Sequence, residues 1–144
     1  MIQSMASKDP IVVGMVVVGH GRLGAEMVQT IEAVMGPLDA LEAVATSPTE
    51  SVEEIRAHVA AAVRRVDRGR GVLILTDMLG DTPTNQSMRV ARETGAEVVA
   101  GINMPILVKL TQARRDMDSH ALARFIRRYG QDHIFWATEP STGR

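Results

Sequence analysis

Residues 11–24 read IVVGMVVVGHGRLG, and they indicate the fold class of the chain. Residues 11–18 form a short, β-branched apolar run bounded by proline and glycine, which predicts a buried strand. The apolar spacing then becomes helical, and Gly36-Pro37 ends the predicted helix. The apolar positions of that helix are Leu23, Met27, Val28, Ile31, Val34 and Met35. A buried strand followed by a glycine turn and a helix is typical of a parallel α/β sheet.

Strand patterns recur along the rest of the chain. Further strands are expected at residues 41–46, 72–76 and 97–102, with a short final strand at 133–138. Strands that alternate with helices predict an α/β fold with a mostly parallel sheet. Right-handed crossovers in one small domain favour a flavodoxin-like three-layer sandwich with strand order 2-1-3-4, to which the final strand is added.

Signals for helix ends lie between these strands. Ser51-x-x-Glu54 has the pattern of a capping box, which predicts that a helix begins there. Thr82 suits the N-cap of the next helix, because Pro83 after it suits the first helical position. Gly130 is expected to stop the last helix.

Composition limits the possible functions. The 144 residues are enough for one domain, assigned to residues 11–138, with a loose N-terminal extension at 1–10 and a C-terminal tail at 139–144. Sixteen Lys and Arg against 17 Asp and Glu give a net charge of -1, so nucleic acid is not expected as a partner. The absence of cysteine excludes thiolate catalysis. The longest apolar run is too short to span a bilayer, and no cleavage site follows it, which predicts a cytoplasmic protein without membrane insertion.

The strand order places a candidate site. In an open α/β sheet, ligands bind beyond the carboxyl ends of the strands, at the point where the strand order reverses. For the order 2-1-3-4 this point lies between the first and third strands. The loop after the first contains Gly19-His20-Gly21, and the loop after the third runs from Asp77 to Thr82. A histidine, a carboxylate and a helix N-terminus are therefore expected side by side.

This combination of groups suits phosphoryl chemistry. A carboxylate that accepts from one nitrogen of His20 leaves the other ring nitrogen unprotonated and nucleophilic. A helix N-terminus with exposed N–H groups attracts an anion. The hypothesis is that His20 accepts a phosphoryl group beside Asp77.

Two other functional interpretations rest on the same loops. Gly19-x-Gly21-x-x-Gly24 after a strand matches the dinucleotide-binding fingerprint, which would make the chain a nucleotide- or ligand-binding regulatory module. The acidic residue that this fingerprint needs at the end of the second strand is replaced by Thr46-Ser47-Pro48. A metal site on His20 and Asp77 is the weaker alternative, and neither a metal nor a cofactor is predicted. The remaining histidines are expected away from the switch point: His58, His120 and His133.

Three motifs, in this order, resemble the mannose-type IIA component of the bacterial phosphotransferase system. They are Gly19-His20-Gly21, TDMLGDTPTN at residues 76–85 and AGINMP at residues 100–105. The resemblance covers roughly residues 12–138. It implies that His20 is phosphorylated by an HPr-like phosphocarrier and passes the group to a IIB component, in sugar uptake or its regulation. It further implies that Asp77 orients the imidazole.

The same resemblance implies a phosphate site and an assembly. Thr82 stands at the family's Ser/Thr position, and Gly80 and Asp81 precede it. Members usually have two glycines there, so Asp81 departs from the pattern and either faces the phosphate or turns to solvent. Family members are homodimers that exchange their final strand, paired antiparallel, which predicts that role for residues 133–138.

Overall fold

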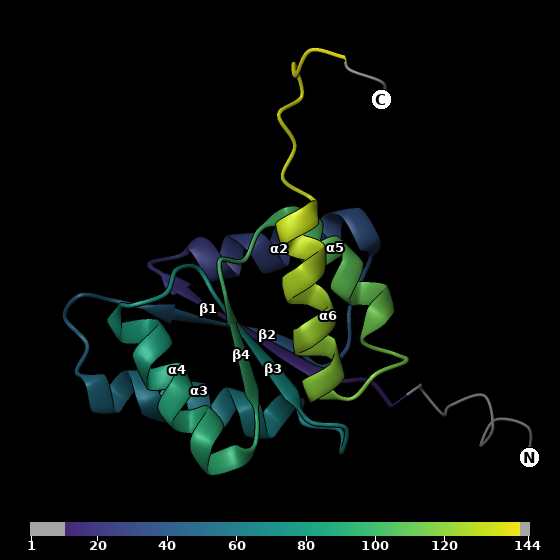
Figure 1. Ribbon diagram of the computed structural model, residues 1–144. Helices are drawn as coiled ribbons and strands as arrows, with labels where there is room; N and C mark the ends of the chain where they lie inside the picture. Colours follow the sequence, from purple (N-terminus) through teal and green to yellow (C-terminus); the bar gives the residue numbers. More distant parts are fainter. Residues whose placement is uncertain (1–10, 142–144) are drawn as a thin grey trace, which may run out of the picture.

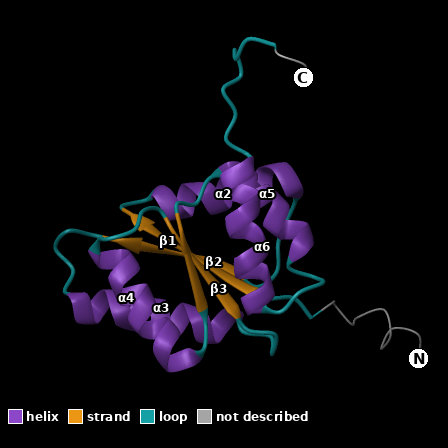
Figure 2. Ribbon diagram, in the orientation of Figure 1, coloured by secondary structure: helices purple, strands orange, loops and turns teal. Residues whose placement is uncertain are grey.

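Four parallel strands form the centre of the protein (Figures 1 and 2). In this computed structural model, which describes residues 11–141, β1 (Gly14–His20) pairs with β2 (Leu41–Thr46) on one side and β3 (Val72–Thr76) on the other. The strand β4 (Glu97–Ala100) pairs with β3. The predicted order 2-1-3-4 is confirmed. The predicted extension at residues 1–10 and the last residues of the predicted tail, 142–144, lie outside the described residues.

Helices cover both faces of the sheet, which gives the three layers expected from the sequence (Figure 1). The helices α3 (Val52–Val66) and α4 (Thr82–Thr94) lie on one face. The other face is covered by α2 (Leu23–Met35), α5 (Met104–Ala113) and α6 (Ser119–Asp132). None of the described helices is long and apolar enough to cross a membrane.

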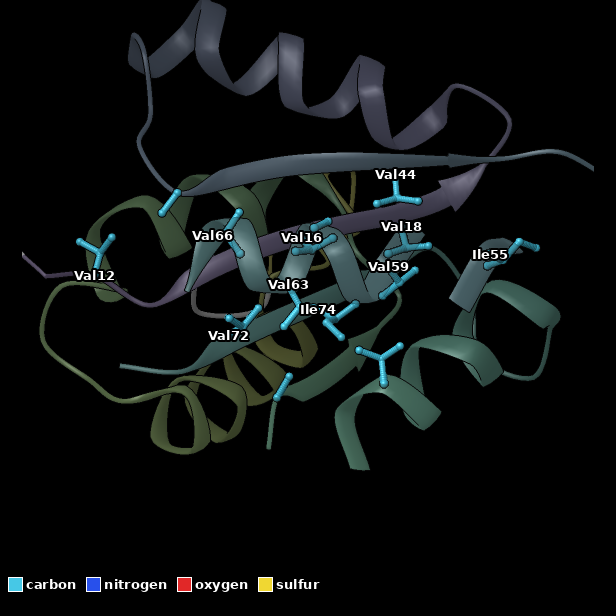
Figure 3. Packing of buried hydrophobic residues seen from close by; sticks show 14 residues of the cluster. Val12, Val16, Val18, Val44, Ile55, Val59, Val63, Val66, Val72 and Ile74 are labelled. Atoms are coloured by element: carbon cyan, nitrogen blue, oxygen red, sulfur yellow. The ribbon is translucent and has the colours of Figure 1, made fainter. Parts of the chain in front are cut away.

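The strand β1 is buried on both faces because successive side chains point to opposite sides of the sheet. Val16 and Val18 pack with Val59 and Val63 of α3 (Figure 3). Met15 and Val17, in between, belong to the cluster under α2, α5 and α6. This double burial explains why the sequence of the strand is continuously apolar.

Two strands end elsewhere than the sequence predicts. The first strand begins at Gly14 and continues through His20, because the ladder with β2 extends to the pair of His20 and Thr46. The strand β4 ends at Ala100 rather than at residue 102. The N–H groups of Gly101 and Ile102 both donate to Thr76 O, at 2.9 and 3.1 Å, so the chain turns there.

Helix ends confirm one prediction and correct two. The capping box is present, since Ser51 Oγ accepts from Glu54 N at 3.1 Å and Glu54 Oε1 accepts from Ser51 N at 3.3 Å. The N-cap of α4 is Asp81 rather than Thr82. Gly130 does not stop α6, which continues to Asp132. A Cβ at Gly130 would lie 2.8 Å from Ile106 Cδ1, so this glycine serves the close packing of α5 against α6.

Residues 133–138 form no strand among the described residues, so the predicted final strand is wrong for the single chain. The chain leaves α6 with the ring of His133 stacked on Tyr129, their centroids 3.6 Å apart. Ile134 and Trp136 then point to solvent, at 77% and 63% exposure. A strand needs a neighbouring strand to bond with, and an exchanged strand would find it on a second copy. The exchange itself stays a prediction.

Candidate active site

The carboxyl ends of β1 and β3 bring His20 and Asp77 into contact. Both strands are parallel neighbours, so the last residue of β1 and the first residue after β3 lie at the same edge of the sheet. His20 Nδ1 lies 2.8 Å from Asp77 Oδ2, which also accepts from the backbone N–H of His20 at 3.0 Å. Asp77 Oδ1 accepts from Met78 N at 3.0 Å. Asp77 is therefore held by two backbone N–H groups, with Oδ2 in contact with the imidazole.

Close packing of α2 against β1 explains Gly19, near the end of β1, and Gly24, in the first turn of α2. A Cβ at Gly24 would lie 3.2 Å from Val17 O, and one at Gly19 would lie 3.1 Å from Gly24 N. Gly21 has a φ of 54°, in the left-handed region that glycine tolerates. At the end of β2, Thr46 Oγ1 donates to Gly19 O at 3.0 Å and so stabilises the same loop. These roles account for the glycine pattern without a bound nucleotide.

Asp81, the residue before α4, faces the ring nitrogen of His20 that Asp77 does not contact. Its Oδ2 lies 3.0 Å from His20 Nε2, so each ring nitrogen has a carboxylate beside it. Asp81 Oδ1 accepts from Thr84 N at 3.2 Å and caps α4. Of the two orientations that the sequence left open for Asp81, the one toward the site is observed.

The two carboxylates favour the charged form of the histidine. The pKa of His20 is raised above its ordinary 6.5, mainly by the hydrogen bond to Asp77; burial opposes this, and the charges of Asp77 and Asp81 add to it. The pKa of Asp77 is lowered: burial would raise it, but the hydrogen bonds and charge of His20 and the N–H of Met78 outweigh that. Protonated His20 therefore stabilises the fold below pH 6.5, and that contribution is lost as the pH rises through the raised pKa. A nucleophilic Nε2 is favoured at higher pH.

A cavity of about 360 Å³ adjoins His20. Thr82 and Asp81, both predicted to lie at a phosphate, line it together with His20. Gly80, the third residue of that prediction, is not among the lining residues; its φ of 96° turns the loop. The remaining lining residues come from the loop after β1, from the end of β2 and the segment that follows it, and from α3 and α4: Gly21, Thr46, Ser47, Pro48, Glu50, Val52, Ile55 and Pro83.

Two buried threonines that the sequence did not single out hold the site loop. Thr84 Oγ1 donates to Met78 O at 2.5 Å and lies 2.9 Å from Thr76 Oγ1. Both threonines are fully buried. Both residues lie in the motif at 76–85, eight positions apart, but nothing in the sequence indicates that their side chains touch.

None of the other histidines lines the His20 cavity, although the partner of His58, Glu50, does. His58 pairs with Glu50 at 3.1 Å and His120 with Glu97 at 3.0 Å. The ligating atoms of His20, Asp77 and Asp81 lie within 4.8 Å of one another, and these are residue types that bind cations. In the structure, Asp77 Oδ2 contacts Nδ1 of His20 and Asp81 caps α4.

Comparison with known proteins identifies the family. A family model described as "EIIA-man: PTS system fructose IIA component" matches residues 14–127. The mannose-specific EIIAB component of Escherichia coli K12 is 32% identical over 103 residues, which are 70% of this chain. The chain spans only 32% of that relative's length. The sorbose-specific EIIA component of Lacticaseibacillus casei is 22% identical over 128 residues, 88% of this chain and 92% of the relative.

A solved structure supports the fold independently. The mannose/sorbose-specific IIA subunit from Enterococcus faecalis superposes with a TM-score of 0.80 at 22% identity, covering 91% of this chain and 98% of that one. At this identity the likeness establishes the flavodoxin-like fold, and the family match covers most of the chain. The chain therefore belongs to the mannose-type IIA components of the sugar phosphotransferase system, a family of phosphotransferases.

Proposed function

We propose that this chain carries a phosphoryl group on His20, taken from a phosphorylated HPr-like carrier and passed to a IIB component in sugar uptake or its regulation. The observation that carries the proposal is the 2.8 Å contact between His20 Nδ1 and Asp77 Oδ2, which leaves Nε2 as the nucleophile. A cytoplasmic location belongs to the same proposal, because phosphoenolpyruvate, the source of the group, is a cytoplasmic metabolite.

The transfer is a displacement at phosphorus. His20 first loses its Nε2 proton to solvent, and the freed lone pair forms the new N–P bond. The bond between phosphorus and the donor nitrogen breaks, its electron pair stays on that nitrogen, and the donor imidazole takes up a proton. Asp77 stabilises the positive charge that develops on the ring of His20.

The N-terminus of α4 supports the phosphoryl oxygens. Its partial positive charge attracts an anion beside His20. Pro83 has no N–H, and Thr84 N donates to Asp81. Among the first three residues of the helix, Thr82 is therefore the one whose backbone N–H can donate to the phosphoryl oxygens, and its hydroxyl is a second donor.

Phosphorylation can be tested directly by intact mass. We expect the chain, incubated with phosphoenolpyruvate, the general phosphotransferase enzyme and HPr, to gain the mass of one phosphoryl group, and we expect acid to remove it. No mass gain at any donor ratio contradicts the proposal. That outcome favours the alternative from the sequence, a ligand-binding regulatory module that uses Gly19-x-Gly21-x-x-Gly24.

A homodimer built through residues 131–138 is the second part of the proposal. The strand β4 lies at an edge of the sheet, and an apolar hollow of about 710 Å³ adjoins it, lined by residues of β4 and α6 and by Ile134. An unpaired strand edge is an aggregation risk unless it is covered, and the chain also exposes Ile134 and Trp136. Residues 133–138 of a second copy, paired antiparallel with β4, would cover both.

Light scattering at micromolar concentration tests this assembly. We expect twice the 15.6 kDa of one chain, and the mass of a single chain for the double substitution Ile134→Ser, Trp136→Ser. Val34→Ser is the matched control, because Val34 is 64% exposed on α2, which supplies no residue to the hollow, and the substitution should leave the dimer intact. A mass of one chain for the unmodified protein contradicts the exchange.

A further inference from the structure

We propose that Asp81 raises the phosphoryl-transfer potential of phosphorylated His20, so that half-loading of the chain needs a more strongly phosphorylated donor pool than it would without this carboxylate. This inference rests on the proposed carrier function and concerns the same site. It assigns to Asp81 the tuning of the loading equilibrium, whereas Asp77 orients the ring.

Asp81 is a fixed negative charge beside the reacting nitrogen. Its Oδ2 lies 3.0 Å from His20 Nε2, and its side chain is only 20% exposed. The Oδ2 atom is buried and lacks a well-aligned hydrogen bond among the described residues. Oδ1 is engaged by Thr84 N, so the carboxylate is held by the helix that it caps. If the carboxylate turned to solvent, α4 would lose its N-cap hydrogen bond from Thr84 N.

The charge of Asp81 disfavours loading through its effects on both the unloaded and the loaded state of His20. In the unloaded chain, the carboxylate attracts the protonated imidazole. In the loaded chain, the phosphoryl group carries nearly two negative charges and is bonded to Nε2, so its oxygens come within contact range of Asp81 Oδ2. Attraction before loading and repulsion after it both lower the equilibrium constant for loading.

Asp81 also competes for the donors of the helix. Thr84 N is one of the N–H groups at the start of α4, and it donates to Asp81. A phosphoryl group at this helix N-terminus therefore has one donor fewer. A group that is bound less favourably is passed on more readily, so the same residue favours transfer to the acceptor.

The test is a titration of the phosphorylated fraction against the ratio of phosphoenolpyruvate to pyruvate. For Asp81→Gly we expect half-loading at a ratio about three- to tenfold lower than for the unmodified chain. The shift should shrink in 1 M salt, where the screening length is about 3 Å instead of about 10 Å at 0.1 M. Asp81→Ser keeps an N-cap residue without the charge and should shift the curve in the same direction.

Asp118→Gly is the matched control. Asp118 caps α6 through Ala121 N at 2.8 Å, as Asp81 caps α4, but on a different helix and outside the residues that line the His20 cavity. We expect its loading curve to match that of the unmodified chain, which separates loss of a cap from loss of the charge.

A proton titration of the His20 ring by NMR gives a readout that needs no donor. The carboxylates around the ring are Asp77 and Asp81, with Glu50 across the cavity. Asp81→Ser should lower the titration midpoint, because one of the charges that raise the pKa of His20 is removed.

Superimposable loading curves for the unmodified chain and Asp81→Gly, both phosphorylated, overturn the inference and leave the carrier function standing. Absence of phosphorylation in every variant contradicts the carrier function and the inference with it.

Discussion

His20→Ala is expected to abolish phosphoryl acceptance completely. Alanine has no nucleophile, and no second histidine lines the cavity beside the α4 N-terminus. The fold should persist, since the side chain of His20 is 46% exposed and the backbone N–H of residue 20 still donates to Asp77. Intact mass after incubation with the complete donor system measures the result, and circular dichroism confirms that the variant is folded.

His120→Ala supplies the matched control for this experiment. His120 is also an exposed histidine paired with a carboxylate, since its Nδ1 lies 3.0 Å from Glu97 Oε1. It lies on α6, outside the candidate site, so its removal should leave phosphorylation unchanged. A mass gain that survives in folded His20→Ala would show that another residue accepts the group.

Asp77→Asn is expected to fold normally and to slow transfer from the phosphorylated carrier by on the order of ten- to a thousandfold. Asp77 Oδ2 accepts from both the backbone N–H and Nδ1 of His20. An amide has one acceptor oxygen in place of two, and its NH₂ group can face the ring and favour the wrong tautomer. The substitution also removes the charge that stabilises a positive imidazole.

Single-turnover transfer measured by rapid quench gives the rate, and NMR gives the ring titration. The midpoint should fall in Asp77→Asn, because the hydrogen bond to Asp77 is the main cause of the raised pKa of His20. Asp39→Asn is the control: Asp39 also has a lowered pKa, mainly from its hydrogen bond with Arg68, but it lies outside the His20 cavity. A folded Asp77→Asn variant that transfers at the unmodified rate would remove Asp77 from the mechanism.

Local patterns in the chain were sufficient for the topology and for the central pair of the site. Continuous apolar runs separated by helical spacing predict a parallel sheet, and right-handed crossovers restrict its order. Once the order places β1 beside β3, His20 and Asp77 must be neighbours, because the carboxyl ends of adjacent parallel strands share an edge. The capping box at Ser51 was equally readable, since both of its bonds join residues three positions apart.

Features that depend on contacts between distant segments could not be predicted from local sequence patterns. Gly130 resembles a helix stop, but its reason is Ile106 on another helix. Residues 133–138 have a strand's composition, but a strand forms only when it bonds to a partner strand, and within the single chain these residues pair with none. The sequence shows that Asp81 precedes a helix, whereas its distance from His20 Nε2 depends on how α4 packs beside β1. A sequence pattern reports each residue's own backbone preference and periodicity, and side-chain direction between elements is set by packing that only the folded chain supplies.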